Sequence, residues 1–350
     1  MKKNRSEERN MRIVKVNKDS IANILSDLLK RSPTNYGDFQ DKVDAIIKNV
    51  RDNGDKAVFD YTAQFDKAEI NAENILVTEE EIKEAYEEVD DELIKVIRKA
   101  IKNIRDFHEK QIQKSWFETR EDGVMLGQKV TPMETCGVYV PGGKAVYPSS
   151  VLMNIVPAHV AGVKNIIMTT PPGKDGKVTA NTLVAAKEAG ATKVYKVGGA
   201  QAIAAMAFGT ESIPKVDKIV GPGNIFVALA KKAVYGNVSI DSIAGPSEIL
   251  VLADETANPR YVAADLLSQA EHDEMASAIL VTTSEELAHK VSDEIDGFLN
   301  QLSRKEIMEK SLDSFGYILV ASDMKEAIDT ANAIASEPVS YTHLTLPTIR

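Results

Sequence analysis

The sequence predicts an α/β protein in which parallel β-sheets are flanked by helices. Strand-then-helix units follow one another from Thr135 to Gly236, and a second series of the same kind runs from Ile249 to Ser322. Such units make consecutive strands parallel and place the helices on the faces of the sheet. Glycine-rich segments follow the strands of the first series, at the sheet edge where open parallel sheets bind their ligands.

Two helical regions are predicted before the first series. Residues 39–66 carry apolar residues at helical spacing, and "DNGD" at 52–55 divides them into two helices. A longer helical region from 78 to 112 begins at a capping box formed by Thr78 and Glu81. Its expected buried stripe consists of Val89, Leu93, Ile97, Ile101 and Ile104.

The remaining elements are read from short apolar runs and the helical patterns between them. In the first series we expect strands at 136–140, 165–172, 193–199 and 218–223, with helices at 151–160, 179–190, 200–209 and 224–236. Gly190 is expected to end its helix. In the second series we expect strands at 249–254, 278–283 and 317–322, with a helix from Asn258 to about Met275. Residues 242–247 are expected to connect two sheets.

Composition limits the classes of function. The 350 residues carry 52 acidic and 42 basic side chains, a net charge of −10, which argues against a nucleic-acid or anionic-membrane partner. With one cysteine, Cys136, the chain forms no intramolecular disulfide, and a cytoplasmic location is expected. No apolar run reaches the roughly 20 residues of a membrane span, and the first residues lack the apolar core of a signal peptide.

The glycine-rich segments are the first candidate ligand site. They read "YVPGGKAVYPSS", "VGGAQAIAA", "VGPGNIFVA" and "IAGPSEILV", and each lets backbone N–H groups approach an anion near a helix N-terminus. None contains the dinucleotide fingerprint G-x-G-x-x-G. Glycines also form ordinary turns, but four such segments at equivalent positions favour a nucleotide or another anionic ligand.

The stretch "SQAEHDEMA" is the second candidate. Gln269 and His272 stand three residues apart, which places them on one face of the expected helix. Two residues do not complete a zinc site, which requires about four ligands or three with an open position, so their spacing alone does not establish a metal site. Cys136 is typical of a small buried apolar residue beside a strand.

Three long segments resemble histidinol dehydrogenase, the enzyme of the last steps of histidine biosynthesis. They are "GVYVPGGKAVYPSSVLMNIVPAHVAGV", "GGAQAIAAMAFGTESIPKVDKIVGPGN" and "IDSIAGPSEILVLADETANPRYVAADLLSQAEHD". The resemblance runs from about Val14 to about Glu337 and rests on long, specific motifs.

The resemblance implies oxidation of L-histidinol to L-histidine through a bound aldehyde, with two NAD and one water. It also implies a zinc ion that orients the substrate, two incomplete Rossmann-like domains, and a homodimer with shared active sites. Matched residue by residue, Tyr139, Gln201 and Asn224 would bind NAD, and Ser247 would contact the substrate. Gln269 and His272 would bind both zinc and substrate, and Glu337 would be catalytic.

The expected domains follow from the same resemblance. Residues 1–36 form an N-terminal extension and helical arm, and residues 37–126 with 237–337 form a first α/β domain carrying the zinc and substrate residues. Residues 127–236 form a second α/β domain carrying the NAD-binding residues. Residues 338–350, "PVSYTHLTLPTIR", are expected to be a tail foreign to the family.

This tail departs from the family pattern. Pro338 stands where the family has its catalytic His, and we do not expect His343 to replace it. The Asp and His that complete the zinc site, a further substrate-binding Glu and the family's C-terminal stretch have no match in these residues. A proline does not remove the hydroxyl proton as a neutral imidazole does, so the chain as written is expected to be inactive.

Two other classes of function remain open on the sequence. One is an aldehyde dehydrogenase in which Cys136 is a covalent nucleophile activated at a helix N-terminus. The other is a non-catalytic protein that binds a nucleotide or another ligand without turnover.

Overall fold

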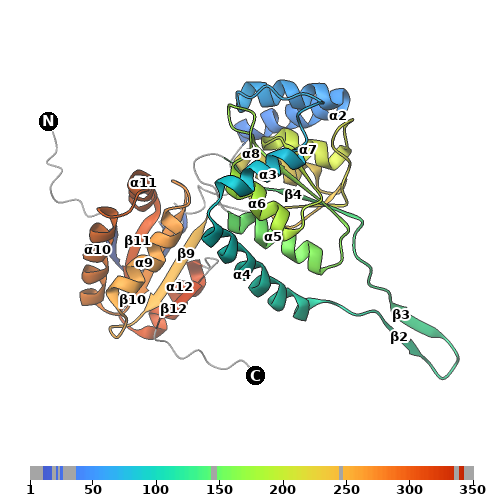
Figure 1. Cartoon of the computed structure of the whole chain (residues 1–350). Coiled ribbons are helices and arrows are strands. Elements are labelled where there is room, and N and C mark those ends of the chain that lie inside the picture. Colours follow the sequence, from blue (N-terminus) through green and yellow to red (C-terminus); the bar gives the residue numbers. More distant parts are fainter. Residues whose placement is uncertain are drawn as a thin grey trace. The chain divides into compact units, whose positions relative to one another are not determined.

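The computed structural model describes residues 11–17, 21–22, 24–26, 37–142, 148–243, 247–334 and 339–342, the last four as backbone only. The chain forms two compact units (Figure 1). Unit 1 comprises Met1–Asn35 and Gly245–Arg350, and unit 2 comprises Tyr36–Ala244. Both contain a parallel sheet with helices on its faces, as the sequence predicts.

Unit 2 is built on a five-stranded parallel sheet of order β6-β5-β4-β7-β8. Its strands are β4 (Thr135–Tyr139), β5 (Asn165–Thr170), β6 (Lys193–Lys196), β7 (Lys218–Val220) and β8 (Ser239–Ile240). On one face lie α7 (Gly199–Phe208) and α8 (Ile225–Val234), with α2 (Gly37–Phe65) packed outside them. On the other lie α5 (Pro148–Val160) and α6 (Ala180–Ala189), with α3 (Glu79–Glu88) and α4 (Asp91–His108) packed outside them.

Local signals in the sequence explain several of these boundaries. Gly54, with φ 54°, breaks α2 where "DNGD" predicted a division, and Gly190, with φ 98°, ends α6 in the left-handed conformation. The capping box of Thr78 and Glu81 is formed. The helical region after it is divided in two, because Val89 adopts an extended conformation and Asp90 caps a new helix.

Unit 1 contains a second parallel sheet, of order β1-β11-β10-β9-β12. Its strands are β1 (Arg12–Lys15), β9 (Glu248–Ala253), β10 (Ser277–Thr282), β11 (Gly316–Val320) and β12 (Val339–Thr342). The helices α9 (Pro259–Ala270), α10 (Glu285–Leu299) and α11 (Lys305–Phe315) pack on one face, and α12 (Met324–Ile334) packs on the other. In both sheets the chain moves outward by two strands and returns to the far side of the first, as in a Rossmann sheet.

The domain boundaries differ from those expected. Residues 37–126 belong to the same unit as 127–236 and do not join 237–337. The reason lies in packing, because α2 covers α7 and α8 and the Val77 N–H donates to the Val194 carbonyl at 2.9 Å. Without these N-terminal helices the outer apolar surfaces of α5, α6, α7 and α8 would be exposed. The connection at 242–247 does fall between the units, as expected.

A hairpin extends from unit 2 between α4 and β4 (Figure 1). The 3-10 turn η2 (Glu109–Gln111) leads into β2 (Trp116–Thr119), which pairs antiparallel with β3 (Met125–Gln128). Every residue of both strands is exposed. Among the described helices none is both long and apolar enough to cross a bilayer.

Candidate functional site

The strand order of unit 2 creates a switch point between β4 and β7. From β4 the chain proceeds to β5 and β6 on one side, then returns to β7 on the other side of β4. The helices that follow β4 and β7 therefore lie on opposite faces of the sheet, and the carboxyl ends of these strands are where dinucleotides bind in such sheets. Tyr139 ends β4, and Asn224 is the N-cap of α8 directly after β7. Both lie at this edge.

Gly221 allows the ends of β4 and β7 to approach one another closely. Its φ is +113°, and a Cβ at this position would lie 2.1 Å from the Tyr139 carbonyl oxygen. A side chain is therefore excluded by backbone conformation and by contact with another backbone. Asn224 completes the turn, because its Oδ1 accepts from the N–H groups of Phe226 at 3.1 Å and Val227 at 3.3 Å.

An ion pair between a buried lysine and a partly exposed carboxylate holds the same turn in place. The Lys231 side chain is 3% exposed, and its Nζ donates to the Gly221 carbonyl at 2.9 Å and forms an ion pair with Asp241. Asp241 Oδ2 accepts from the Gly221 N–H at 2.8 Å. Sequence reasoning did not identify this pair, although a lysine on the sheet-facing side of an apolar helix is a signal that could have done so.

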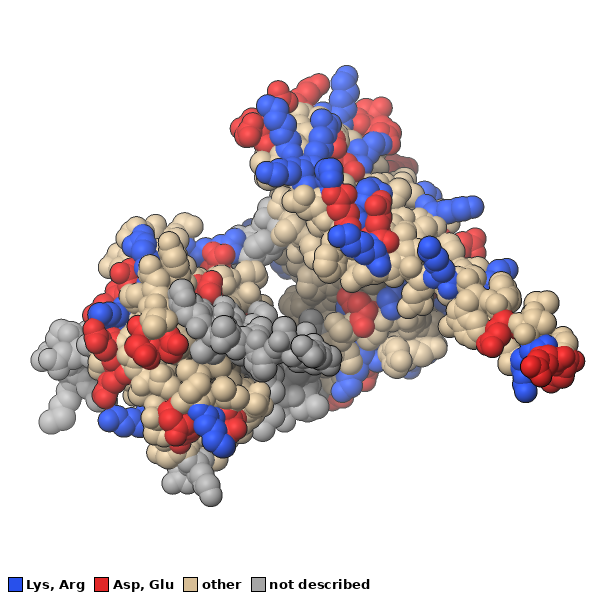
Figure 2. Space-filling view, turned by 90° about the horizontal axis from the view of Figure 1, so that it is seen from below, with Lys and Arg blue, Asp and Glu red and all other residues tan. Residues whose placement is uncertain are grey.

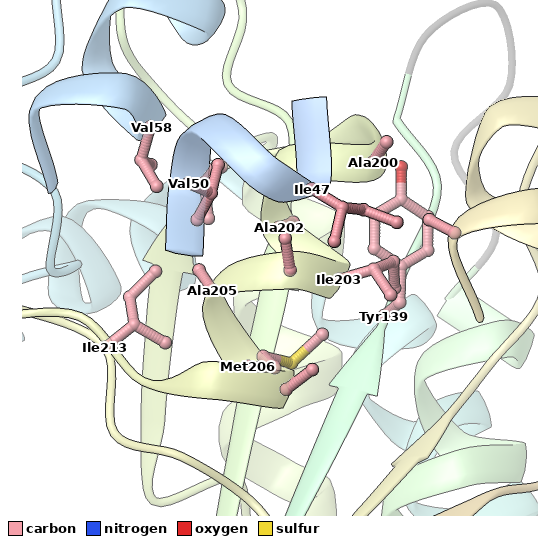
Figure 3. Packing of buried hydrophobic residues seen from close by; sticks show 14 of the residues in the cluster. Ile47, Val50, Val58, Tyr139, Ala200, Ala202, Ile203, Ala205, Met206 and Ile213 are labelled. Atoms are coloured by element: carbon pink, nitrogen blue, oxygen red, sulfur yellow. The ribbon is translucent and has the colours of Figure 1, made fainter. Parts of the chain in front are cut away.

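Tyr139 connects β4 to the start of α7 (Figure 3). Its hydroxyl oxygen accepts from the Gly199 N–H at 3.2 Å, and Gly199 has φ 64°. Burial raises the pKa of Tyr139 to about 12, so the hydroxyl is neutral near pH 7 and keeps its proton for donation. The side chain packs beside Ala200 in the core cluster shared with α2.

The Gln201 side chain gives the strongest indication of a ligand at this edge. It lies in the first turn of α7 and is 1% exposed, yet neither Oε1 nor Nε2 has a hydrogen-bond partner among the described residues. An unpaired buried amide is costly, and a ligand with polar groups would satisfy it. Tyr139, Gln201 and Asn224 thus come from three connections of one sheet edge, and they fit a dinucleotide there.

The other predicted residues lie in unit 1. Ser247 directly precedes β9, and its carbonyl accepts from the Ser277 N–H at 2.9 Å at the start of β10. Gln269 is in the last turn of α9, and His272 follows before β10 begins. All three therefore lie at the amino ends of β9 and β10, the opposite type of edge from the one occupied by the residues of unit 2.

The expected helix from Asn258 to about Met275 is too long. α9 ends at Ala270 and Glu271 is its C-cap, so His272 lies beyond the helix and does not share a helical face with Gln269. The two remain close because the His272 N–H donates to the Gln269 carbonyl at 3.0 Å in a turn. Gln269 is partly buried and His272 is exposed.

The donor chemistry at this turn fits part of a zinc site. An imidazole nitrogen and an amide oxygen are both able to bind zinc, but a zinc site requires about four ligands. Within the described residues, no group of three or more His, Cys, Asp or Glu side chains is arranged to hold a metal ion. The turn at 269–272 would therefore supply only two ligands to a zinc ion, and further ligands would have to join them.

The comparisons with known proteins identify the family. Its sequence model, described as histidinol dehydrogenase, matches residues 29–348. The histidinol dehydrogenase of Bacillus subtilis is 59% identical over 295 residues, 84% of this chain and 69% of that protein. That of Halalkalibacterium halodurans is 54% identical over 328 residues, 93% of this chain and 75% of that protein.

The chain belongs to the histidinol dehydrogenase family. The fold agrees, because the crystal structure of histidinol dehydrogenase from Elizabethkingia anophelis superposes with a TM-score of 0.88 at 38% identity. That superposition covers 96% of this chain and 76% of the other. The family and α/β fold expected from the sequence are both confirmed.

The histidinol dehydrogenase match continues beyond Glu337 to residue 348, into the segment that we expected to be foreign to the family. Residues 339–342 also form β12, a parallel strand beside β9. The catalytic candidate Glu337 lies outside the described residues, as do Pro338 and His343.

Cys136 does not have the surroundings of a nucleophile. It is 3% exposed in the core between the β4–β8 sheet and the helices α3–α6. Burial raises the pKa of its thiol to about 11, so almost none of it is thiolate at neutral pH. As the second residue of β4, it is also distant from the carboxyl end that carries Tyr139. The surroundings of Cys136 argue against the alternative of a cysteine-dependent aldehyde dehydrogenase.

Proposed function

We propose that this family member oxidises L-histidinol to L-histidine through bound L-histidinal, with two NAD as hydride acceptors, in the last steps of histidine biosynthesis. The observation that carries the NAD assignment is the buried, unpaired amide of Gln201 at the edge of a Rossmann-type sheet. The substrate is inferred from the relatives, which are called histidinol dehydrogenase at 54–59% identity.

In this proposal the chain's polar groups divide between two tasks. Tyr139, Gln201 and Asn224 bind the dinucleotide, with the Tyr139 hydroxyl donating and the Gln201 amide both donating and accepting. Gln269 and His272 provide an amide oxygen and an imidazole nitrogen to zinc, and Ser247 contacts the substrate at the same sheet edge. Zinc, when bound, would hold and orient the substrate.

The reaction also requires proton transfers. The first oxidation removes a hydride from the CH2–OH carbon while a base takes the hydroxyl proton, and an imidazole suits that role near neutral pH. The second oxidation follows addition of water to the aldehyde, which the Glu337 carboxylate would assist. Pro338 provides no base, so we propose that a polypeptide of residues 1–350 binds nucleotide without turnover.

The turnover test uses three proteins: residues 1–350, the same polypeptide with Pro338→His, and a chain completed after Glu337 with the C-terminal sequence of the Bacillus subtilis relative. NADH formation from L-histidinol is measured for each. We expect activity only in the completed chain, because loss of a general base reduces rates by about 10²- to 10⁴-fold and the restored base alone lacks the zinc ligands. Turnover by either of the first two proteins contradicts the proposed need for the base and zinc ligands of the added segment, and inactivity of the protein with that segment contradicts the proposed reaction.

The same proteins test the zinc assignment. Residues 1–350 should retain well under one zinc per chain after treatment with a chelator, whereas the completed chain should retain roughly one, because a stable site requires about four ligands. Stoichiometric, chelator-resistant zinc in residues 1–350, measured by elemental analysis, would show that other groups complete the site.

We also propose a homodimer, and the hairpin of unit 2 supports it. Trp116, Phe117, Met125 and Leu126 are each more than half exposed on its two strands. Figure 2 shows that charged side chains gather at its tip while the rest of the arm shows few of them. An isolated two-stranded hairpin is marginally stable, and a second copy of the chain would cover these side chains. Phe117→Ser should shift the sedimentation equilibrium toward monomer, with Glu118→Gln on the same strand as the control.

A further inference from the structure

Asp66 is a carboxylate without an assigned role beside the candidate nucleotide site. It directly follows α2, and its Oδ2 atom is buried with no hydrogen-bond partner among the described residues. The next residue, Lys67, has φ 58°, a left-handed conformation that is uncommon for residues other than glycine. Ala68 is 1% exposed and belongs to the same core cluster as Tyr139 and Ala200. The turn at 66–68 is therefore held firmly by packing.

Packing places the 66–68 turn near the site, because Ala68 shares its core cluster with Tyr139 and Ala200. Burial is the main cause of the raised pKa of the Tyr139 hydroxyl, and the negative charge of Asp66 adds to it. The same hydroxyl accepts from the Gly199 N–H, at the start of the helix that carries Gln201. Two side chains near the elements that carry Tyr139, those of Asp66 and Gln201, thus have buried polar atoms without a hydrogen-bond partner among the described residues.

We propose that the Asp66 carboxylate accepts a hydrogen bond from a ribose hydroxyl of the dinucleotide and selects NAD over nucleotides that carry a phosphate on that ribose. The inference rests on the proposed function, because it requires NAD to bind at this sheet edge. A carboxylate is a pure acceptor and a ribose presents two adjacent O–H donors. Rossmann sheets use an acidic side chain for this contact, and a phosphate at the same place would be repelled.

The neighbouring cation, Lys67, makes a hydrogen bond to a backbone carbonyl, which leaves the Asp66 carboxylate free to accept a hydrogen bond from a ligand. The Lys67 ammonium donates to the Gln64 carbonyl at 2.7 Å. Burial raises the pKa of Asp66 to about 6, so the group is ionised at pH 8. A buried anion without a donor is unfavourable, and a ribose hydroxyl would supply that donor.

The test measures binding of NAD and NADP to residues 1–350 at pH 8 by isothermal titration calorimetry, so that it does not depend on turnover. The variants are Asp66→Asn, which keeps the shape and removes the charge, and Asp66→Ser as a second replacement. Glu69→Gln, at an exposed acid on the same loop, is the matched control. Gln201→Ala tests the site itself.

We expect Asp66→Asn to weaken NAD binding about 10- to 100-fold, the range for a hydrogen bond to a charged group, and Glu69→Gln to leave it unchanged. If NADP binding improves in Asp66→Asn while NAD binding weakens, the carboxylate contacts the adenosine ribose. That result supports the proposal. If both weaken equally, the carboxylate contacts the nicotinamide ribose, which is the same in NAD and NADP, and the proposed selection of NAD is overturned.

Other outcomes separate the inference from the proposed function. NAD affinity unchanged in both Asp66 variants, together with lost affinity in Gln201→Ala, overturns the role of Asp66 and leaves the nucleotide site in place. A wild-type chain that binds no NAD overturns the proposed site and the inference with it.

Discussion

Replacing Gly221 with alanine tests the close approach of β4 and β7 on which the proposed nucleotide site depends. The new Cβ would lie 2.1 Å from the Tyr139 carbonyl oxygen and 3.0 Å from its carbonyl carbon. Both atoms belong to the backbone of a central strand, so neither moves as a flexible side chain does. The ends of the two strands would have to separate by about 1 Å to restore ordinary contact distances.

Two effects contribute to the expected loss of stability. The left-handed backbone conformation of a residue with a side chain lowers the free energy of unfolding by roughly 1–2 kcal/mol. Overpacking of the new Cβ lowers it by about 1–3 kcal/mol more. Gly236→Ala is the matched control, because Gly236 has φ +99° and its Cβ would meet nothing within 4 Å. The control therefore isolates the conformational effect from the contact with Tyr139.

Differential scanning calorimetry and NADH titration measure the two consequences. Gly221→Ala should lower the Tm of unit 2 by about 2–12 °C more than Gly236→Ala, at roughly 2–4 °C per kcal/mol for a unit of this size. NADH affinity should fall about tenfold or more only in Gly221→Ala, since displacement by an ångström separates Tyr139 from Asn224. Equal Tm values and equal NADH affinities in the two variants would refute the reasoning.

Three further predictions follow from buried groups. Asp66→Asn should raise Tm at pH 8, because the pKa of Asp66, raised to about 6, means that the ionised carboxylate destabilises the folded state. The difference in Tm between variant and wild type should shrink as the pH falls from above 6 to below 3.8. A Tm difference that does not depend on pH would contradict this. Lys231→Met should lower stability by about 1–3 kcal/mol, because the Gly221 carbonyl loses its buried donor and the Asp241 carboxylate, 32% exposed, loses its cation. The double variant with Asp241→Asn should recover part of that loss in calorimetry, and no recovery would show that the charge of Asp241 is not part of the cause. Cys136→Ala should reduce stability by less than about 2 kcal/mol and leave NADH affinity unchanged. Loss of NADH affinity, or loss of turnover in the completed enzyme, would instead support a mechanism in which Cys136 is the nucleophile.

Local features of the fold could be predicted because their causes are local. The division of α2 at Gly54 and the end of α6 at Gly190 follow from glycine conformation, and the start of α3 follows from the Thr78–Glu81 capping box. Alternation of buried strands and helices was enough to predict parallel sheets. The resemblance to the family located Tyr139, Gln201 and Asn224, and the structure brings their connections to one sheet edge.

What the sequence did not predict depends on contacts between distant segments. The return of β7 beside β4, and the packing of residues 37–126 with 127–236, are set by tertiary burial rather than by any local pattern. α9 ends at Ala270 although helix-forming residues continue, because the chain must turn to enter β10. Asp66 carries no local signal, since only the fold packs the 66–68 turn against the core cluster that contains Tyr139.

Hydrogen–deuterium exchange with and without NAD tests the central claim most directly, namely that the dinucleotide binds at the carboxyl edge of the β4–β8 sheet. Saturating NAD should slow amide exchange in the segments at the ends of β4, β6 and β7, which contain Tyr139, Gly199 and Gly221. Exchange at the carboxyl ends of β9 and β10 in unit 1 should not change. Protection confined to unit 1, or bound NAD without protection at any of the three segments of unit 2, would contradict the account.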